Sequence, residues 1–316
     1  MSRAASQTAA PPAPRAVPLA KRLRRALRVR ALLLLLPLLS RLPHRAALAL
    51  GAAAGRLAWL LARRHRRAAL EHLAIAFPQR DARWRARVGR SSFENLGRSA
   101  LEMLAVERLD LARTVQFEPG SLEAMTAAHA EGGGVVAISC HLDNWELLAR
   151  CVAAAGFPVA TVAREAQDKR LTILLERSRA STGIVSLWRD NPTSARAFIR
   201  HLRKGGVVAA LIDQDTEVAG HFVPFFGREA FTPRAPADLA LRLDAPVVFA
   251  RICRVASGMH RIRISRLALP SSGDREADSR ALTAAATAAI EQEVRARPDQ
   301  WVWMHARWRT QPGTIG

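Results

Sequence analysis

Residues 132–164 read GGGVVAISCHLDNWELLARCVAAAGFPVATVAR. The three glycines predict a turn, and the apolar run at 135–139, with two valines, predicts a buried strand. Helix-forming residues follow at 147–155 and end at Gly156, where a helix C-cap belongs. A second apolar run at 157–162 predicts another strand, which leads to Arg164. The segment is therefore an α/β unit whose polar residues lie at the carboxyl end of a strand.

The polar residues at this strand end include His141 and Glu146, spaced as H-x4-E. On one regular helix the two side chains would point roughly 140° apart, so they can meet only if a turn separates them. We predict that Glu146 lies in the first helical turn and accepts a hydrogen bond from the His141 imidazole. The other ring nitrogen is then a base for a substrate hydroxyl. In the competing interpretation, Asp143 and Glu146 form a capping box at the helix start.

The three cysteines, Cys140, Cys151 and Cys253, do not form a disulfide framework and indicate a reducing compartment. Cys140 precedes the candidate base, so a thiol nucleophile is an alternative. Consecutive residues of a strand point to opposite faces, and we therefore expect Cys140 in the core and His141 in the site.

The net charge of +21 over 316 residues is concentrated near the N-terminus. Up to Leu70 there are 15 Arg or Lys residues and no Asp or Glu. Between the basic clusters lie two apolar runs, Ala31–Leu39 and Ala46–Ala62, the second broken only by Arg56. This combination favours a lipid surface over nucleic acid as the partner.

Neither apolar run reaches the roughly 20 residues of a clean membrane span, and Pro37 and Pro43 interrupt the pair. The segment either crosses once or lies in the interface as a helix pair. The flanking basic clusters favour a shallow arrangement on the anionic cytoplasmic leaflet, with the catalytic body in the cytoplasm. The segment lacks the pattern of a cleaved signal peptide.

Alternating strand and helix patterns continue to the C-terminus. They predict an α/β fold with a mixed, mostly parallel central sheet flanked by helices. A strand at 207–212 ends in Asp213, Gln214 and Asp215, and HFVPFFGR at 221–228 is expected to be an apolar loop beside the site. We expect Arg261–Leu267 to be an edge strand, and the residues from Trp301 to Ala306 to alternate along a strand. The predicted division is a disordered basic tail (1–30), membrane-anchoring or interfacial helices (31–67), a catalytic domain (68–310) and a short tail (311–316).

Several motifs occur in one order along the chain: HLDNWE at 141–146, Arg164, Arg177 with Arg179, DQD at 213–215, VPFFGR at 223–228, and QWVWMHARW after Glu291 and Pro298. In this order they resemble the late acyltransferases of lipid A biosynthesis, the lauroyl and myristoyl transferases of Gram-negative inner membranes. The likeness begins near residue 30. It implies a fold like that of the glycerolipid and lysophospholipid acyltransferases.

The resemblance also implies an activity and a set of site residues. A fatty acyl chain would pass from a thioester of acyl carrier protein, or of coenzyme A, to a hydroxyl of a lipid A precursor without metal or redox cofactor. The implied catalytic residues are His141, Glu146, Arg177 and Asp213. We assign substrate binding to Arg164, Arg179, Asp215, Phe225, Phe226 and Arg228. Asp143 stands where many members have Gly, and we expect its charge to act on the base.

Two other classes compete with this assignment. A metal-dependent hydrolase would bind a cation through His141, Asp143, Asp213 and Asp215, although the chain has no H-E-x-x-H or C-x-x-C motif. A basic scaffold protein would need no His141. Within the acyltransferases, the acceptor could instead be another glycolipid or a lysophospholipid.

Overall fold

The computed structural model describes residues 19–166, 168–189, 193–255 and 258–313. Its centre is a seven-stranded sheet in the order β1-β9-β8-β2-β5-β3-β4, in which every neighbouring pair is parallel except the antiparallel pair β8–β9. The strands are β1 (Val115–Phe117), β2 (Val135–Ser139), β3 (Val159–Ala163), β4 (Val185–Trp188), β5 (Val207–Leu211), β8 (Val247–Arg254) and β9 (His260–Leu267). The predicted mixed, mostly parallel α/β sheet is confirmed.

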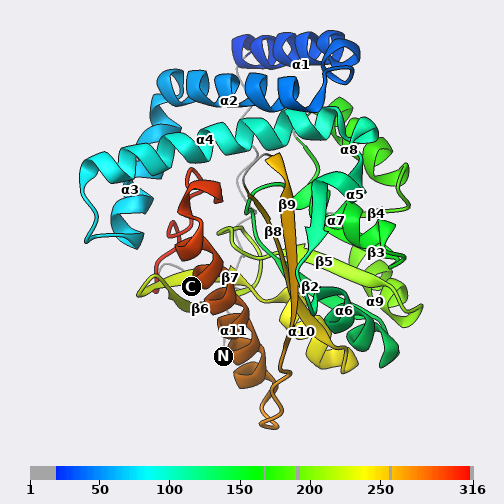
Figure 1. The fold of residues 1–316 in the computed structure, drawn as a ribbon. Helices are drawn as coiled ribbons and strands as arrows, with labels where there is room; N and C mark the ends of the chain where they lie inside the picture. The colour runs from blue at the N-terminus through cyan, green and yellow to red at the C-terminus, as the bar shows by residue number, and fades with distance from the viewer. Residues whose placement is uncertain (1–18, 167, 190–192, 256–257, 314–316) are drawn as a thin grey trace, which may run out of the picture.

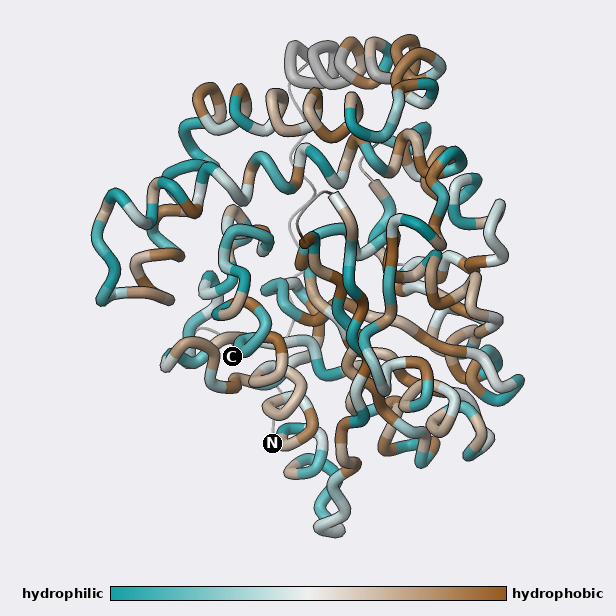
Figure 2. Tube along the Cα trace, viewed as in Figure 1, coloured by the Kyte–Doolittle hydropathy of each residue, from teal (hydrophilic) through white to brown (hydrophobic). Residues whose placement is uncertain are grey.

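Alternate residues of the central strand β2 pack into two different cores. Val135 and Ala137 join one hydrophobic cluster, while Val136 and Ile138 join the other, as the two-residue period of a strand requires. The first core is covered by α6 (Ser121–Ala130) and α7 (Trp145–Ala154), and the second by α10 (Ala235–Leu243) and α11 (Arg275–Ala296). Helices α8 (Lys169–Ala180) and α9 (Ser194–Arg203) flank β4 (Figure 1). Figure 2 shows the hydrophobic residues concentrated on the central strands.

The stretch HFVPFFGR forms a hairpin, so the predicted loop is wrong. Strand β6 (Gly220–Phe225) pairs antiparallel with β7 (Arg228–Pro233) in a separate two-stranded sheet. The turn consists of Phe226 and Gly227, both with positive φ (53° and 73°), the backbone that two-residue hairpins favour. Pro224 is tolerated because a two-stranded sheet leaves one edge of each strand without a partner.

Two further predictions about strands are also wrong. Strand β9 lies inside the sheet, because the short strand β1 pairs with its outer edge. The C-terminal tryptophan segment follows the 3-10 turn Pro298–Gln300 and forms only a single bridge, Leu142 with Trp301, before it continues as turns. Its residues instead pack between the hairpin and α3 (Arg63–Ala76), where Trp301 and Trp303 are fully buried.

Four N-terminal helices lie across one end of the sheet: α1 (Leu19–Leu39), α2 (His44–Leu61), α3 and α4 (Ala82–Leu104) (Figure 1). A one-turn 3-10 helix (Val106–Arg108) and α5 (Leu111–Thr114) then lead into β1. Helices α2 and α4 are in close backbone contact. The approach is so close that a Cβ on Gly97 would lie 2.1 Å from the carbonyl oxygen of Gly51. Residues 19–30 are helical rather than disordered as predicted, and residues 1–18 of that predicted tail lie outside the described residues.

The described residues contain no single helix that combines the length and apolar composition needed to cross a membrane. Helices α2 and α3 meet these requirements only together, and they are bent by 91° where they join.

Candidate active site

The sheet register brings His141 and Asp213 together. Strands β2 and β5 are parallel neighbours, with Ser139 opposite Leu211. His141 and Asp213 each follow two residues after these partners, so both leave the carboxyl ends of adjacent central strands at the same height. Open α/β sheets commonly place their sites at this edge.

The Asp213 carboxylate contacts both the backbone and the ring of the candidate base, His141. His141 donates from its backbone N–H to Asp213 Oδ2 (2.8 Å), and its Nδ1 lies 2.7 Å from Asp213 Oδ1. Trp301 Nε1 also donates to Oδ2, at 2.7 Å. Burial alone would raise the pKa of the Asp213 carboxyl, but the charge of His141 and the hydrogen bonds from His141 and Trp301 outweigh burial and hold this pKa well below its usual range. An ionised carboxylate only accepts hydrogen bonds, so Nδ1 of His141 carries a hydrogen, and in the neutral form of the imidazole Nε2 has a lone pair.

Glu146 does not hold the imidazole as predicted. It lies in the first turn of α7, as expected, but its carboxylate binds Arg179 in a bidentate pair (Nη2–Oε1 2.6 Å, Nε–Oε2 3.0 Å). Within the described parts of the chain, no hydrogen bond joins Glu146 to His141. The orienting acid is therefore Asp213, which comes from the neighbouring strand, and Arg179 is buried against Glu146 rather than displayed for a phosphate.

Asn144, and not the Asp143–Glu146 capping box of the competing interpretation, caps helix α7. The Asn144 side chain accepts a hydrogen bond from Leu147 N at 3.1 Å. Asp143 has a positive φ of 48°, a conformation in which Gly is favoured and Asp is tolerated. Its carboxylate turns away from the base into a buried cluster, where His260 Nδ1 lies 2.6 Å from Oδ2 and Arg254 Nη2 lies 3.4 Å from Oδ1.

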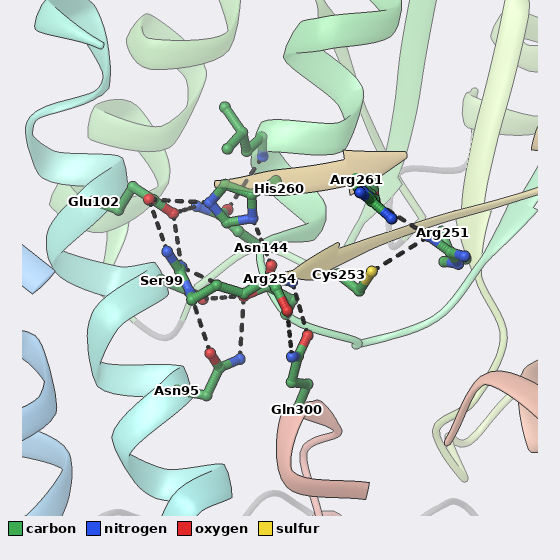
Figure 3. A network of polar contacts seen from close by, with 12 residues as sticks. Asn95, Ser99, Glu102, Asn144, Arg251, Cys253, Arg254, His260, Arg261 and Gln300 are labelled. Atoms are coloured by element: carbon green, nitrogen blue, oxygen red, sulfur yellow. Dashed lines mark hydrogen bonds and ion pairs between the residues drawn. The ribbon is translucent and has the colours of Figure 1, made fainter. Parts of the chain in front are cut away.

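This cluster connects the loop of Asp143 and Asn144 to helix α4 (Figure 3). Glu102 on α4 accepts hydrogen bonds from Arg254 on β8 (2.9 Å) and Asn144 (2.8 Å), and it lies 3.1 Å from His260 on β9. Asn95 donates to Asp143 at 3.1 Å. The charge of Asp143 is therefore balanced inside the protein, which corrects the expectation that it acts on His141.

Burial and pairing set the charges in this cluster. Burial would lower the pKa of His260, but its hydrogen bonds to Asp143 and Glu102 outweigh burial and raise that pKa to about 9. Burial would raise the pKa of Glu102, but hydrogen bonds from His260 and Arg254 lower it to about 2. The cluster thus contains two cations, His260 and Arg254, and two carboxylates at neutral pH.

Three side chains that sequence reasoning did not assign to the site lie against His141. The Trp145 ring lies 4.7 Å from the His141 ring, and the His305 ring lies 5.1 Å away and nearly perpendicular. Gln214 Nε2 lies 2.9 Å from His141 Nε2. The motifs HLDNWE, DQD and QWVWMHARW contain all three, but periodicity alone does not show which members of a motif face one another.

A small, largely apolar cavity lies between α7 and the sheet. Its volume is about 60 Å³, and His141 is not among its lining residues. Small side chains leave this space: Ala137, Ala149, Ala209, Ala210 and Ala250. Trp145, Glu146 and Arg179 also line it, and Trp145 connects the cavity wall to the His141 ring.

The remaining predicted residues do not converge on His141. Phe225 and Phe226 are buried in the aromatic core with Trp301 and Trp303, so they do not form the wall of a site. The buried Asp215 carboxylate accepts from Thr310 N (2.6 Å) and Thr310 Oγ1 (2.9 Å) and so fixes the C-terminal segment. The remaining arginines of the predicted site are exposed: Arg164 after β3, Arg177 on α8 and Arg228 on β7. Cys140 is buried in the core as predicted, and burial raises the pKa of its thiol.

The four residues that the hydrolase alternative assigns to a cation do not converge on one point. Asp213 pairs with His141, whereas Asp143 pairs with His260 and Asp215 with Thr310. In the described ranges, no three His, Cys, Asp or Glu side chains are arranged to hold a metal ion. The His141–Asp213 pair instead has the geometry that a general base with an orienting acid requires.

Comparison with known proteins gives a consistent result. The family model for bacterial lipid A biosynthesis acyltransferases matches residues 19–310. The lipid A biosynthesis palmitoleoyltransferase of Escherichia coli K12 is 24% identical over 275 residues, covering 86% of this chain and 87% of the relative. A phosphatidylinositol mannoside acyltransferase of Mycobacterium tuberculosis is 24% identical over 223 residues, which is 69% of each chain.

Proposed function

This chain belongs to the family of bacterial lipid A biosynthesis acyltransferases, and we propose that it moves a fatty acyl chain from an acyl thioester to a hydroxyl of a lipid A precursor. The observation that carries the proposal is the His141 imidazole, held through Nδ1 by Asp213 at the sheet edge, with Trp145 of a small apolar cavity against its ring. These are the parts needed to activate an alcohol beside an acyl chain.

In the proposed reaction, His141 Nε2 takes the proton of the acceptor hydroxyl while the oxygen attacks the thioester carbonyl carbon. An alcohol is a weak nucleophile at neutral pH, and general-base catalysis of this kind contributes roughly 10²- to 10⁴-fold. Asp213 orients the ring and stabilises the imidazolium that forms, as the acid of a catalytic triad does. The tetrahedral intermediate then expels the thiolate, which receives the proton back from His141.

In this proposal the acyl chain enters along the alanine and valine lining of this cavity, which must widen from about 60 Å³ to admit it. Trp145 lines the cavity and lies against the His141 ring, so the cavity leads toward the base. The ion pair of Glu146 and Arg179 lies in the same wall. In this proposal Glu146 contributes to the site by holding Arg179 and shaping the cavity.

The exposed arginines supply the charge that the substrates require. Arg164, Arg177 and Arg228 are candidate ligands for the phosphates of the acceptor or of the phosphopantetheine arm of acyl carrier protein or coenzyme A. Leucines on α1 and α2 add an exposed apolar surface, among them Leu34, Leu57, Leu60 and Leu61. Together with the basic N-terminal segment, this surface supports association with the cytoplasmic leaflet of the inner membrane.

A second acceptor class is supported by one observation. The mycobacterial relative is named for acylation of phosphatidylinositol mannoside, so another glycolipid is the alternative acceptor in this chain. Both acceptors would present a hydroxyl to the same base.

The deciding experiment is mass spectrometry of total lipid from a strain that lacks the gene. We expect lipid A without one secondary acyl chain, restored by the wild-type gene and by the control His65→Ala, which alters an exposed histidine on α3. His141→Ala should not restore it. Unchanged lipid A together with a missing acyl chain on another glycolipid would favour the second acceptor, and an unchanged lipid profile would refute acyl transfer.

A further inference from the structure

Two buried hydroxyls line the cavity between α7 and the sheet without a hydrogen-bond partner among the described residues. They are Ser139 Oγ and Thr161 Oγ1, and only 6% and 8% of these residues are exposed. The charged residues of the lining, Glu146 and Arg179, are already paired with each other. The cavity therefore combines an apolar wall with two hydroxyls that are available to a ligand.

The sheet register places the two hydroxyls at different depths. Ser139 is the last residue of β2 and pairs with Leu211, the last residue of β5. Thr161 of β3 pairs with Ala209, two residues earlier on β5. Two residues of a strand span roughly 6.6 Å, so Thr161 lies about that much farther from the sheet edge where His141 follows β2. Ser139 is thus the hydroxyl nearer to the base.

The chemistry of Ser139 indicates what it can recognise. A serine hydroxyl donates one hydrogen bond and accepts others, so it can pair with water or with an alcohol in either direction. The cavity volume of about 60 Å³ is enough for water, because one water needs roughly 10–15 Å³. An unsubstituted acyl chain in this place would leave the Ser139 hydroxyl without a partner, which is unfavourable in an apolar environment. A chain with its own hydroxyl would form the missing hydrogen bond.

We infer that the acyl chain preferred by this enzyme carries a hydroxyl on its second or third carbon, and that Ser139 recognises this hydroxyl. The inference rests on the proposed acyl transfer, in which the thioester carbonyl carbon lies at His141. Because His141 does not line the cavity, the thioester stays outside it, and the first carbons of the chain are those that pass Ser139. Thr161 lies too deep for a hydroxyl at these positions.

The test measures the donor preference of the full-length enzyme with a lipid A precursor as acceptor. The donors are lauroyl, 2-hydroxylauroyl and 3-hydroxylauroyl thioesters of acyl carrier protein, with each hydroxylated chain supplied as separate enantiomers. For the wild type, kcat/KM should be about tenfold higher for one hydroxylated chain than for lauroyl, because only that chain pairs with Ser139. The preferred chain then shows which carbon carries the recognised hydroxyl.

Three variants assign the preference to one side chain. Ser139→Ala removes the hydroxyl, so the ratio of the two kcat/KM values should fall from about tenfold to about one. Thr161→Val removes the deeper hydroxyl of the same cavity and should leave this ratio unchanged. Ser271→Ala, in the exposed loop after β9, is the control for basal activity and should leave both rates unchanged. Thermal unfolding shows which variants are folded.

The outcomes separate this inference from the proposed function. Equal kcat/KM for all the chains in the wild type would overturn the inference, whichever variants fold, and would leave Ser139 with water alone. A preference that persists in folded Ser139→Ala would overturn it as well. In both cases acyl transfer itself stands, whereas the absence of transfer of every chain by the wild type would refute the proposed function.

Discussion

At the residue scale, the proposed base, His141, is positioned by an acid that is 72 residues away in sequence. The parallel pairing of β2 and β5 makes this possible, since both strands end at one edge of the sheet. Glu146, only five residues from His141, points to Arg179 instead. Proximity in sequence is therefore a poor guide to which acid orients the imidazole.

Two substitutions distinguish these acids. Asp213→Asn retains the shape of the side chain but loses the charge that stabilises the imidazolium, so kcat should fall about 10³- to 10⁴-fold, as for the acid of a serine protease triad. Glu146→Gln should have a smaller effect on kcat, because it weakens a cavity wall rather than the base. Single-turnover transfer rates check both. Equal losses in two folded variants would place Glu146 on the base in the working complex.

The buried cluster around Glu102 predicts how stability depends on pH. The pKa of His260 is raised from 6.5 to about 9, so its contribution to stability is fully present below about pH 6.5 and is lost as pH rises through 9. The free energy of unfolding, measured with urea, should therefore decline between pH 7 and 9. His260→Phe should lower it by about 3–5 kcal/mol at pH 7, because two buried carboxylates lose a cation. A flat profile in the wild type would contradict this account.

At the element scale, the sequence predicted the elements that are governed by periodicity. The strands that begin at Val135 and Val207 and the helices around residues 168–180 and 194–202 occur within a few residues of their predicted positions. Strands that form only by pairing with another strand were not predicted. The β6–β7 hairpin contains Pro224 and a turn with Phe226 at positive φ, and neither residue is typical of a hairpin.

The candidate site was likewise predictable only in part. His141 and Asp213 follow strands, so their position at the sheet edge was predictable, whereas the partner of each depends on strand order. Asp143 shows the limit most clearly. Its partners His260 and Arg254 lie more than 100 residues away, and no local pattern indicates that they neutralise it.

The contact between α2 and α4 provides a test at the same scale. A side chain on Gly97 would collide with the Gly51 carbonyl, so Gly97→Leu should destabilise the protein by about 1–3 kcal/mol through overpacking. Ala100→Leu, at an exposed position of the same helix, is the control and should have little effect. Melting temperatures compare the two. Equal stability would mean that the helices separate at low energetic cost.

At the scale of the whole molecule, the exposed leucines of α1 and α2 lie on the helices stacked above the end of the sheet (Figure 1). The cluster of Glu102, Asp143 and His260 connects the loop that follows His141 to α4, which packs on α2. The proposed membrane-facing helices and the base therefore belong to one continuous packed structure.

This arrangement predicts binding to anionic vesicles. Replacing Leu57, Leu60 and Leu61 on α2 by Glu should reduce co-sedimentation with vesicles of phosphatidylglycerol and phosphatidylethanolamine by at least about tenfold, because apolar contact is lost and negative charge is added. A control with three exposed residues of α11 changed to Glu, Arg275, Arg280 and Ala281, should bind better than the α2 variant. Equal binding by the two variants would exclude α2 as the lipid-binding surface.

The central claim is that His141, held by Asp213, activates a hydroxyl for acyl transfer. It is tested most directly by the rate at which purified enzyme transfers a radiolabelled acyl chain from acyl carrier protein to a lipid A precursor. The account predicts transfer by the wild type and by His65→Ala, and a loss of at least about 10²-fold in His141→Ala. Undiminished transfer by folded His141→Ala would contradict it.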